Sequence, residues 1–252
     1  MTFDQADFRV RFEWGPNGLR TLAPVAQVLI IVDVLRFTTA VSVATAAGGL
    51  VLPYRWADDG AAAFAAAHGA ELAGRRHEAN WSLSPTDLAA LPPGTRLVLP
   101  SPNGSALSFA ARELGAHHVA AGCLRNATAT AAYAIARAPY DVMGAIAVVA
   151  AGERWRNHTG PIRPALEDLL GAGAIIDILA QQLGAASLSP DASAARAAFA
   201  DARPVLEARL AECATGRELA ERGWSDDVAS SAALDACDVA AELRDETFLR
   251  AG

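Results

Sequence analysis

The sequence predicts an α/β fold on a mostly parallel sheet, followed by a helical C-terminal third. Two observations carry this prediction. Short apolar runs such as Val28–Val32 alternate with alanine-rich helical patterns through the first two thirds of the chain, and helical patterns dominate from Ser187 onward. An apolar run bounded by polar residues is typical of a strand buried on both faces, as in parallel sheets.

The elements follow in order from this alternation. Strands are expected at 28–32, 50–54, 96–100, 118–121 and 145–151. Helices are expected from about residue 35, at 58–68, from Ser84, at 106–114, at 126–138 and at 164–183. Polar caps, prolines and glycines predict the helix ends. These signals are Asp58 and Ser84 as N-caps, Pro85 and Pro164 at first turns, and Gly69, Gly115 and Pro139 as stops.

Two of these units are alike. Residues 28–53 and 95–121 both contain a strand, a polar loop, a small-residue helix, a stop of glycine or small residues, and a short strand. This likeness predicts an internal duplication. If both strands belong to one parallel sheet, both polar loops open on the same edge of it.

The last third is predicted to be mostly helical. Pro204 opens one helix, Thr215 begins a capping-box pattern that ends near Gly223, and Ser225 caps the next helix. Residues 187–193 are expected to form a surface loop. Because no segment resembles a linker, residues 1–252 are predicted to be a single domain.

Composition limits the partners. The chain has a net charge of -7, is 52% hydrophobic and has only 19% charged residues, which predicts a globular protein without a nucleic-acid surface. No apolar stretch has bilayer length, the first residues lack the apolar core of a signal peptide, and the three cysteines form no CxxC pair. We therefore expect a cytoplasmic protein with no membrane partner, and a homo-oligomer stays an open alternative.

All 21 basic residues are arginine, since the sequence contains no lysine. A Schiff-base lysine, a Walker-type GK[ST] loop and a kinase-type lysine are thereby excluded. Any phosphate or sulfonate must be held by arginine, backbone N–H groups, hydroxyls, amides or a metal ion.

The first candidate site follows the strand at 28–32, where Asp33 ends the apolar run and Arg36 comes three residues later. Ligands of open α/β sheets bind outside the carboxyl ends of the strands. A carboxylate there can hold a divalent cation, and a guanidinium can grip a phosphate in two-pronged fashion. The alternative for Asp33 is an N-cap of the following helix.

Further polar residues follow other strands. The loop Ser101-Pro102-Asn103-Gly104-Ser105 precedes a helix and is either an anion site or simply a turn. Glu167 and Asp168 lie in the first turns of the helix opened by Pro164, where they either stabilise the helix dipole or join Asp33 as metal ligands. Carboxylates without a Cys or His cluster suit Mg²⁺ rather than zinc.

Taken in order, the motifs resemble the 2-phosphosulfolactate phosphatase (ComB-like) family. The matching segments are VDVLRFTTAV (32–41), Arg76, Ser84-Pro85, SPNGS (101–105), GCLRNATATA (122–131), EDLLGAGAII (167–176) and GWSDDVASSAALD (223–235). Each is modestly specific, but the ordered set covers nearly the whole chain. One segment departs from the pattern, because Ser82–Asp87 replaces a loop that is close to GNSPxE in the family.

The resemblance implies a three-layer α/β/α fold with a mixed sheet and Mg²⁺-dependent hydrolysis of 2-phosphosulfolactate to 3-sulfolactate and phosphate. By this resemblance Asp33 and Arg36 are catalytic, and Asp33, Glu167 and Asp168 hold Mg²⁺. Matching positions expected to bind the small acidic phosphorylated substrate are Thr38, Thr39, Arg76, Asn103, Gly104 and Asn126, together with Ser101 and Ser105 of the polar loop. Water and a carboxylate stay open as the attacking group. A non-catalytic binder of anionic metabolites is the alternative function, motivated by the altered loop.

Overall fold

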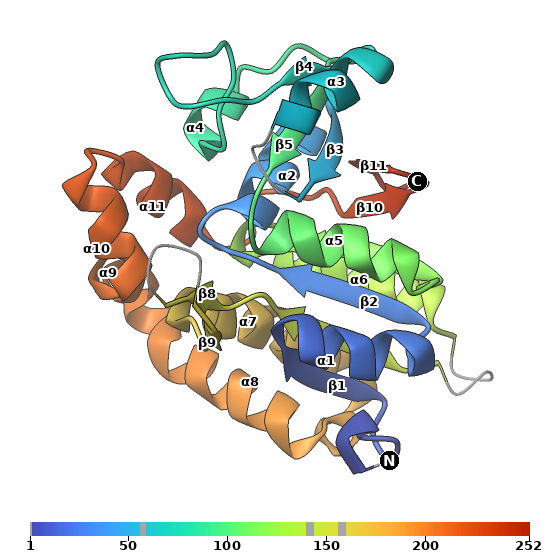
Figure 1. The fold of residues 1–252 in the computed structure, drawn as a ribbon. Helices are drawn as coiled ribbons and strands as arrows, with labels where there is room; N and C mark the ends of the chain where they lie inside the picture. Colours follow the sequence, from blue (N-terminus) through green and yellow to red (C-terminus); the bar gives the residue numbers. More distant parts are fainter. Residues whose placement is uncertain (1, 56–58, 140–143, 156–159) are drawn as a thin grey trace.

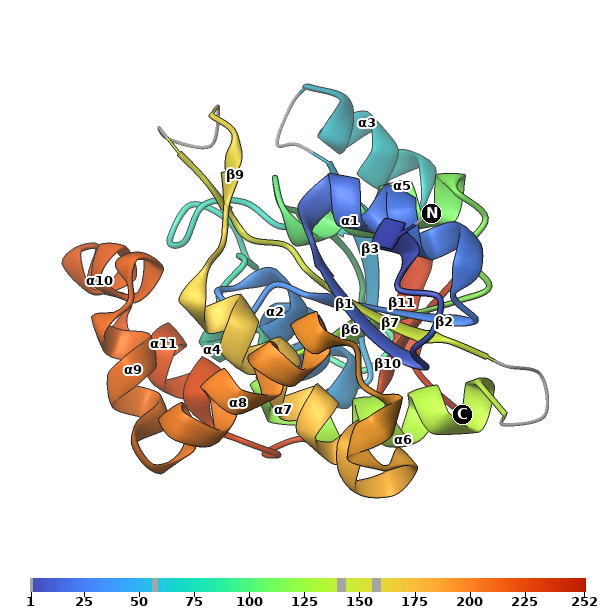
Figure 2. The same ribbon diagram turned by 90° about the horizontal axis from the view of Figure 1, so that it is seen from below.

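The computed structural model describes residues 2–55, 59–139, 144–155 and 160–252. Within these residues nine strands form one mixed sheet with helices on both faces (Figures 1 and 2). Their order across the sheet is β1-β7-β2-β6-β10-β11-β3-β5-β4. The strands are β1 (Val10–Trp14), β2 (Val28–Val32), β3 (Leu50–Tyr54), β4 (Glu71–Leu72), β5 (Arg96–Pro100), β6 (His118–Gly122), β7 (Ile146–Ala150), β10 (Ala241–Arg244) and β11 (Thr247–Arg250), with β8 (Glu153–Arg154) and β9 (Ile162–Arg163) in a separate hairpin.

The helices form two covering layers and one terminal group. α1 (Gly15–Leu22) and α5 (Gly104–Glu113) cover one face, and α6 (Ala127–Arg137), α7 (Leu166–Leu183) and α8 (Pro190–Ala202) cover the other. The remaining helices are α2 (Phe37–Ala46), α3 (Asp59–Ala67), α4 (Pro85–Leu88), α9 (Leu206–Glu212), α10 (Ala214–Glu221) and α11 (Ser225–Ala232). α9, α10 and α11 stack at one end of the sheet, with α11 against α4 (Figure 1).

Strand β2 confirms the prediction of a strand buried on both faces. All five residues are buried, and β2 pairs in parallel with β6 on one side and β7 on the other. Val28, Ile30 and Val32 pack in the core beneath α6 and α7, whereas Leu29 and Ile31 pack beneath α1 and α5. The apolar run thus fills two cores at once, and its carboxyl end is fixed between two neighbours.

The sheet consists of two parallel halves joined by an antiparallel hairpin. β1, β7, β2 and β6 run in parallel, as do β3, β5 and β4, and the hairpin β10–β11 pairs antiparallel with β6 and with β3. Three successive antiparallel pairings reverse the direction, so the halves run in opposite senses. The prediction that both polar loops leave one edge of a single parallel sheet is therefore wrong.

The topology nevertheless agrees with the predicted duplication. The unit β2–α2–β3 crosses from the first half to the second, and the unit β5–α5–β6 crosses back, so that β2 pairs with β6 and β3 with β5. The two polar loops nevertheless meet, because Gly104 N, which follows β5, donates to Asp33 Oδ2, which follows β2.

Several C-terminal predictions need correction. α8 begins at Pro190 with Ser189 as its N-cap, so residues 187–193 are not all surface loop. The N-cap of α10 is Cys213, whose thiol accepts from Gly216 N–H, and Thr215 lies within the helix instead of opening it. Ser225 is the first residue of α11 and not its cap, and the hairpin β10–β11 was not predicted. The expected cap Asp58 lies outside the described residues.

Candidate active site

Asp33 joins the N-termini of two helices. Its Oδ1 accepts a hydrogen bond from Phe37 N (3.3 Å), at the start of α2, and its Oδ2 accepts from Gly104 N (2.7 Å), at the start of α5. Gly104 must be a glycine, because a Cβ at this position would lie 2.7 Å from Asp33 Oδ2. The capping and site interpretations of Asp33 are therefore compatible, since the carboxylate caps helices at the edge of a pocket.

Asp168 also joins separate elements by accepting hydrogen bonds from backbone N–H groups. From the first turn of α7, its Oδ1 accepts from Val34 N (2.7 Å) and its Oδ2 from Gly152 N (2.9 Å). It thereby ties α7 to the loops that follow β2 and β7. Glu167, the preceding residue, is buried as well.

Burial dominates the electrostatics of these acids. It raises the pKa of Asp33 to about 6, with smaller contributions from the charges of Glu153 and Glu167, while the N–H groups of Gly104 and Phe37 oppose the shift. Burial likewise raises the pKa of Asp168 well above its usual value, and the charges of Asp33 and Glu167 add to the shift. The loop after β2, strand β8 and the first turn of α7 thus place acids close enough to repel one another.

These acids do not form a complete protein metal cage. Across the described part of the chain, no three His, Cys, Asp or Glu side chains are grouped so that they could hold a metal ion by themselves. The predicted ligands Asp33, Glu167 and Asp168 are close enough to influence one another electrostatically. Their assignment as metal ligands stays a prediction.

A cavity of about 220 Å³ lies beside Asp33. Its walls come from the loops after β2 and β5, from β8 and from one face of α10. The lining residues are Asp33, Leu35, Arg36, Leu83, Ser101, Pro102, Asn103, Glu153, Thr215, Glu218, Leu219 and Arg222. The N-terminus of α5 opens on this cavity through the loop 101–103, and a helix N-terminus favours an anion. The cavity thus combines the guanidinium groups of Arg36 and Arg222 with the carboxyl groups of Asp33, Glu153 and Glu218.

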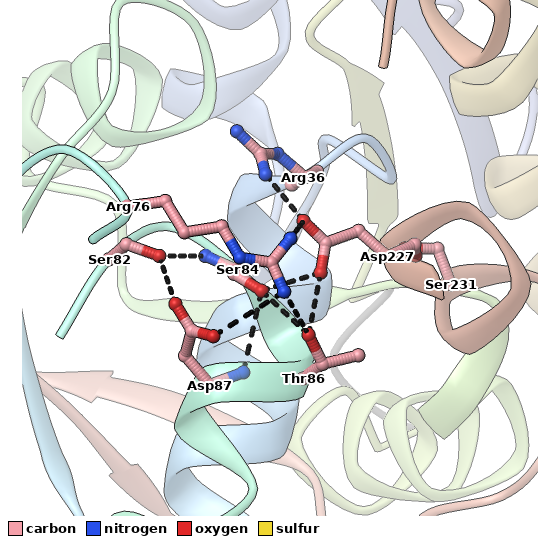
Figure 3. A network of polar contacts seen from close by, with 8 residues as sticks. All are labelled: Arg36, Arg76, Ser82, Ser84, Thr86, Asp87, Asp227 and Ser231. Carbon is pink, nitrogen blue, oxygen red and sulfur yellow. Dashed lines mark hydrogen bonds and ion pairs between the residues drawn. The ribbon is translucent and has the colours of Figure 1, made fainter. Parts of the chain in front are cut away.

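Arg36 is held by a buried carboxylate from the other end of the chain (Figure 3). Its Nη1 lies 2.5 Å from Oδ2 of Asp227, a fully buried residue of α11. Asp227 Oδ1 also accepts from the hydroxyls of Ser84 (2.5 Å) and Thr86 (3.0 Å), at the start of α4. Asp227 therefore fixes Arg36 at the pocket and links α11 to α4.

Arg76 contacts the same carboxylate as Arg36, that of Asp227. Its Nη1 is 3.5 Å from Asp227 Oδ2, and its Nη2 donates to Thr86 Oγ1 (3.0 Å) and lies 3.5 Å from Asp87 Oδ1. Arg76 does not belong to the residues that line the cavity. Its contact with substrate stays a prediction, and the structure gives it partners within the protein.

Four other predicted substrate ligands are fully buried and bond to backbone. Thr38 Oγ1 donates to Asp33 O (2.8 Å), Thr39 Oγ1 donates to Val34 O (2.8 Å), Ser105 Oγ donates to Tyr54 O (2.8 Å), and Asn126 Oδ1 accepts from Cys123 N (2.9 Å). None of them lines the cavity. They shape the loops that carry the site.

The loop after β5 does reach the cavity. Ser101 and Asn103 line it, and Asn103 Nδ2 donates to Glu153 Oε1 (3.1 Å). Asn103 Oδ1 is buried and has no hydrogen-bond partner within the described residues. An orphaned buried acceptor next to a cavity indicates that a ligand or water donates to it there.

Sequence reasoning missed Asp227, Glu153, Glu218 and Arg222. Asp227 follows another acid at the start of a helix, and acids there are common for helix-dipole reasons alone. What distinguishes it is its pairing with Arg36, 191 positions earlier, which only the fold reveals. Glu153 follows the buried strand β7, but no local pattern indicates its contact with Asn103.

The structure is an α/β fold whose candidate site lies at the carboxyl end of a parallel strand, where sheets of this kind bind their ligands. The family model for 2-phosphosulpholactate phosphatase matches residues 17–246, nearly the whole chain, and the chain belongs to this family. It is a phosphatase, a phosphoric monoester hydrolase, and its family implies a small phosphorylated substrate. No curated protein gives a significant match. Among the described residues, no helix is both long and apolar enough to span a bilayer.

Proposed function

We propose that the chain hydrolyses 2-phosphosulfolactate to 3-sulfolactate and phosphate, with Mg²⁺ as its cofactor. The observation that carries the proposal is the position of Asp33, a buried carboxylate at the meeting point of two helix N-termini and beside Arg36 in the cavity. The family match favours this enzyme over the alternative of a non-catalytic anion binder.

The donor chemistry of the site fits Mg²⁺. Asp33, Glu167 and Asp168 offer hard oxygen ligands, and the repulsion among them would be relieved by a cation. Proteins usually hold Mg²⁺ through one or two carboxylates, with water and substrate phosphate completing the shell. A cage of three protein ligands is therefore not required. When bound, Mg²⁺ supplies Lewis-acid polarisation of the phosphoryl group.

The chain's own residues would orient the substrate and balance its charge. Arg36 has one nitrogen fixed by Asp227 and faces the cavity, where its guanidinium can bind phosphoryl oxygens. The N-terminus of α5 adds its dipole to the same end of the cavity. Positive groups placed in advance stabilise charge that develops as the phosphoester bond breaks.

The test is release of inorganic phosphate from a panel of small phospho-acids, with and without EDTA. We expect turnover of 2-phosphosulfolactate that EDTA abolishes and Mg²⁺ restores. Asp33→Asn should lower kcat/KM by about 10²–10³-fold, the usual loss when a key charged or oriented group is removed. Asp226→Asn, at an exposed neighbour of Asp227, is the control. Activity that survives either EDTA or Asp33→Asn contradicts the metal role.

A further inference from the structure

One face of α10 forms a wall of the cavity. Thr215, Glu218, Leu219 and Arg222 line it, and their spacing of three, four and seven residues places them on the same side of a helix. α10 belongs to the C-terminal helical third, which none of the motif-based predictions placed at the site. The wall opposite Asp33 therefore carries its own charged groups.

Arg222 and Arg36 approach the same indole ring. Arg36 Cζ lies 4.7 Å from the ring centroid of Trp224, and Arg222 Cζ lies 5.6 Å from it. Both arginines line the cavity, and the lining residues that the structure describes include no other cation. Two guanidinium groups thus flank one aromatic residue and face one ligand-sized space.

The two arginines differ in how firmly they are held. The Arg36 side chain is 13% exposed and is fixed by the buried Asp227. The Arg222 side chain is 51% exposed and pairs with Glu218, one turn earlier on the same helix. An exposed pair of this kind contributes little to stability, so a ligand can replace Glu218 at little cost.

We propose that Arg222 binds a second anionic group of the substrate, a carboxylate or sulfonate, while Arg36 binds the phosphoryl group. The inference rests on the proposed function and names Arg222 as a determinant of specificity. Arg76 is a poorer candidate for this role, because its guanidinium is directed toward Asp227, Asp87 and Thr86, away from the cavity lining. A guanidinium presents a planar pair of donors that matches such oxyanions.

The experiment compares two substrates in variants of α10. We expect Arg222→Gln to raise KM for 2-phosphosulfolactate about 10- to 100-fold, as for the loss of a charged hydrogen bond, with kcat nearly unchanged. It should leave KM for glycerol 2-phosphate, which has no second acidic group, unchanged. Arg222→Lys should recover part of the affinity. Arg217→Gln, at an exposed arginine of the same helix, is the matched control.

Two kinetic results and one binding result would overturn the inference. Equal losses on both substrates would mean that Arg222 supports the phosphoryl site or the fold, and no loss on either would remove it from the site. Calorimetry separates this inference from the proposed function. If the wild-type protein hydrolyses no panel member, binding of 3-sulfolactate still decides the matter: Arg222→Gln should weaken it and spare inorganic phosphate. Wild-type protein that binds no 3-sulfolactate contradicts the inference.

Discussion

Asp33 and Asp227 are both buried aspartates, but the groups that compensate them differ in kind. Asp33 accepts hydrogen bonds from two backbone N–H groups at helix N-termini. Asp227 faces the guanidinium groups of Arg36 and Arg76 and accepts from two hydroxyls. One carboxylate is compensated by dipoles alone among these contacts, and the other by full positive charges.

The difference separates a carboxylate that is expected to bind a ligand or metal from one that holds the surrounding elements together. A buried carboxylate without a cationic partner keeps an elevated pKa and can still gain from a cation that arrives with the substrate. A buried carboxylate that already has two guanidinium partners holds the surrounding elements together. Asp227 is thus expected to matter most for folding, and Asp33 for ligand and metal binding.

The largest expected effect is the loss of stability when Asp227 is replaced. Asp227→Asn removes one partner of a buried ion pair, and such losses typically cost about 3–5 kcal/mol in the free energy of unfolding. Urea unfolding followed by circular dichroism measures this cost, with Asp226→Asn at the exposed neighbour as the control. If the free energies of unfolding of the two variants differ by less than about 1 kcal/mol, Asp227 does not hold these elements together, and the contrast with Asp33 disappears.

The second effect is the pH dependence of Mg²⁺ binding through Asp33. Because burial raises the pKa of Asp33 from 3.8 to about 6, the carboxyl group binds a proton below that pH. This shift favours the folded metal-free protein at low pH, and the advantage is lost as the pH rises through about 6. Mg²⁺ binds the charged form, so its affinity should fall by at least about tenfold per pH unit below about 6, and protonation of Asp168, whose pKa is also raised, adds to this fall.

Calorimetric titration of Mg²⁺ between pH 5 and pH 8 measures this dependence. Asp33→Asn should remove most of the affinity and make the remaining pH dependence less steep, because only Asp168 then contributes a raised pKa. An affinity that is level across the whole range would mean that Asp33 is not a ligand.

The smallest effect is expected at Arg76, which contacts Asp227 but does not line the cavity. Arg76→Gln leaves Arg36 paired with Asp227 and removes interactions of a side chain that is 17% exposed, so we expect a loss of about 1 kcal/mol in stability. KM for the phosphorylated substrate should change less than about threefold, equivalent to about 0.7 kcal/mol. A tenfold rise in KM would instead place Arg76 in contact with the substrate, as the family resemblance implied.

Local sequence patterns predicted the parts of the molecule that local chemistry determines. The buried run at β2, the cap at Ser84 and the long helix α7 all follow from residue periodicity and capping. The position of Asp33 at the end of a buried strand predicted a candidate site there, and a cavity lies beside it. Glu167 and Asp168, predicted from their place in the first turns of a helix and again by the resemblance, lie near Asp33 in the fold.

The remainder depends on contacts between distant segments. No local signal shows that α10 lines the cavity or that Asp227 pairs with Arg36, since these contacts arise only when the C-terminal helices pack beside α4. The reversed second half of the sheet was missed because β10 and β11 are short and polar on one side. Thr38, Thr39, Ser105 and Asn126 match a family pattern, but a pattern does not distinguish a residue that shapes a loop from one that touches a ligand.

The position of the hairpin β10–β11 also has a consequence for synthesis of the chain. These strands lie at the centre of the sheet although they are the last strands in the sequence. On the ribosome, β6 and β3 therefore remain unpaired edges until residues 241–250 have emerged, whatever the state of the earlier units. Exposed strand edges are sites of aggregation. The interval before the hairpin emerges is when the nascent chain is most exposed to this hazard.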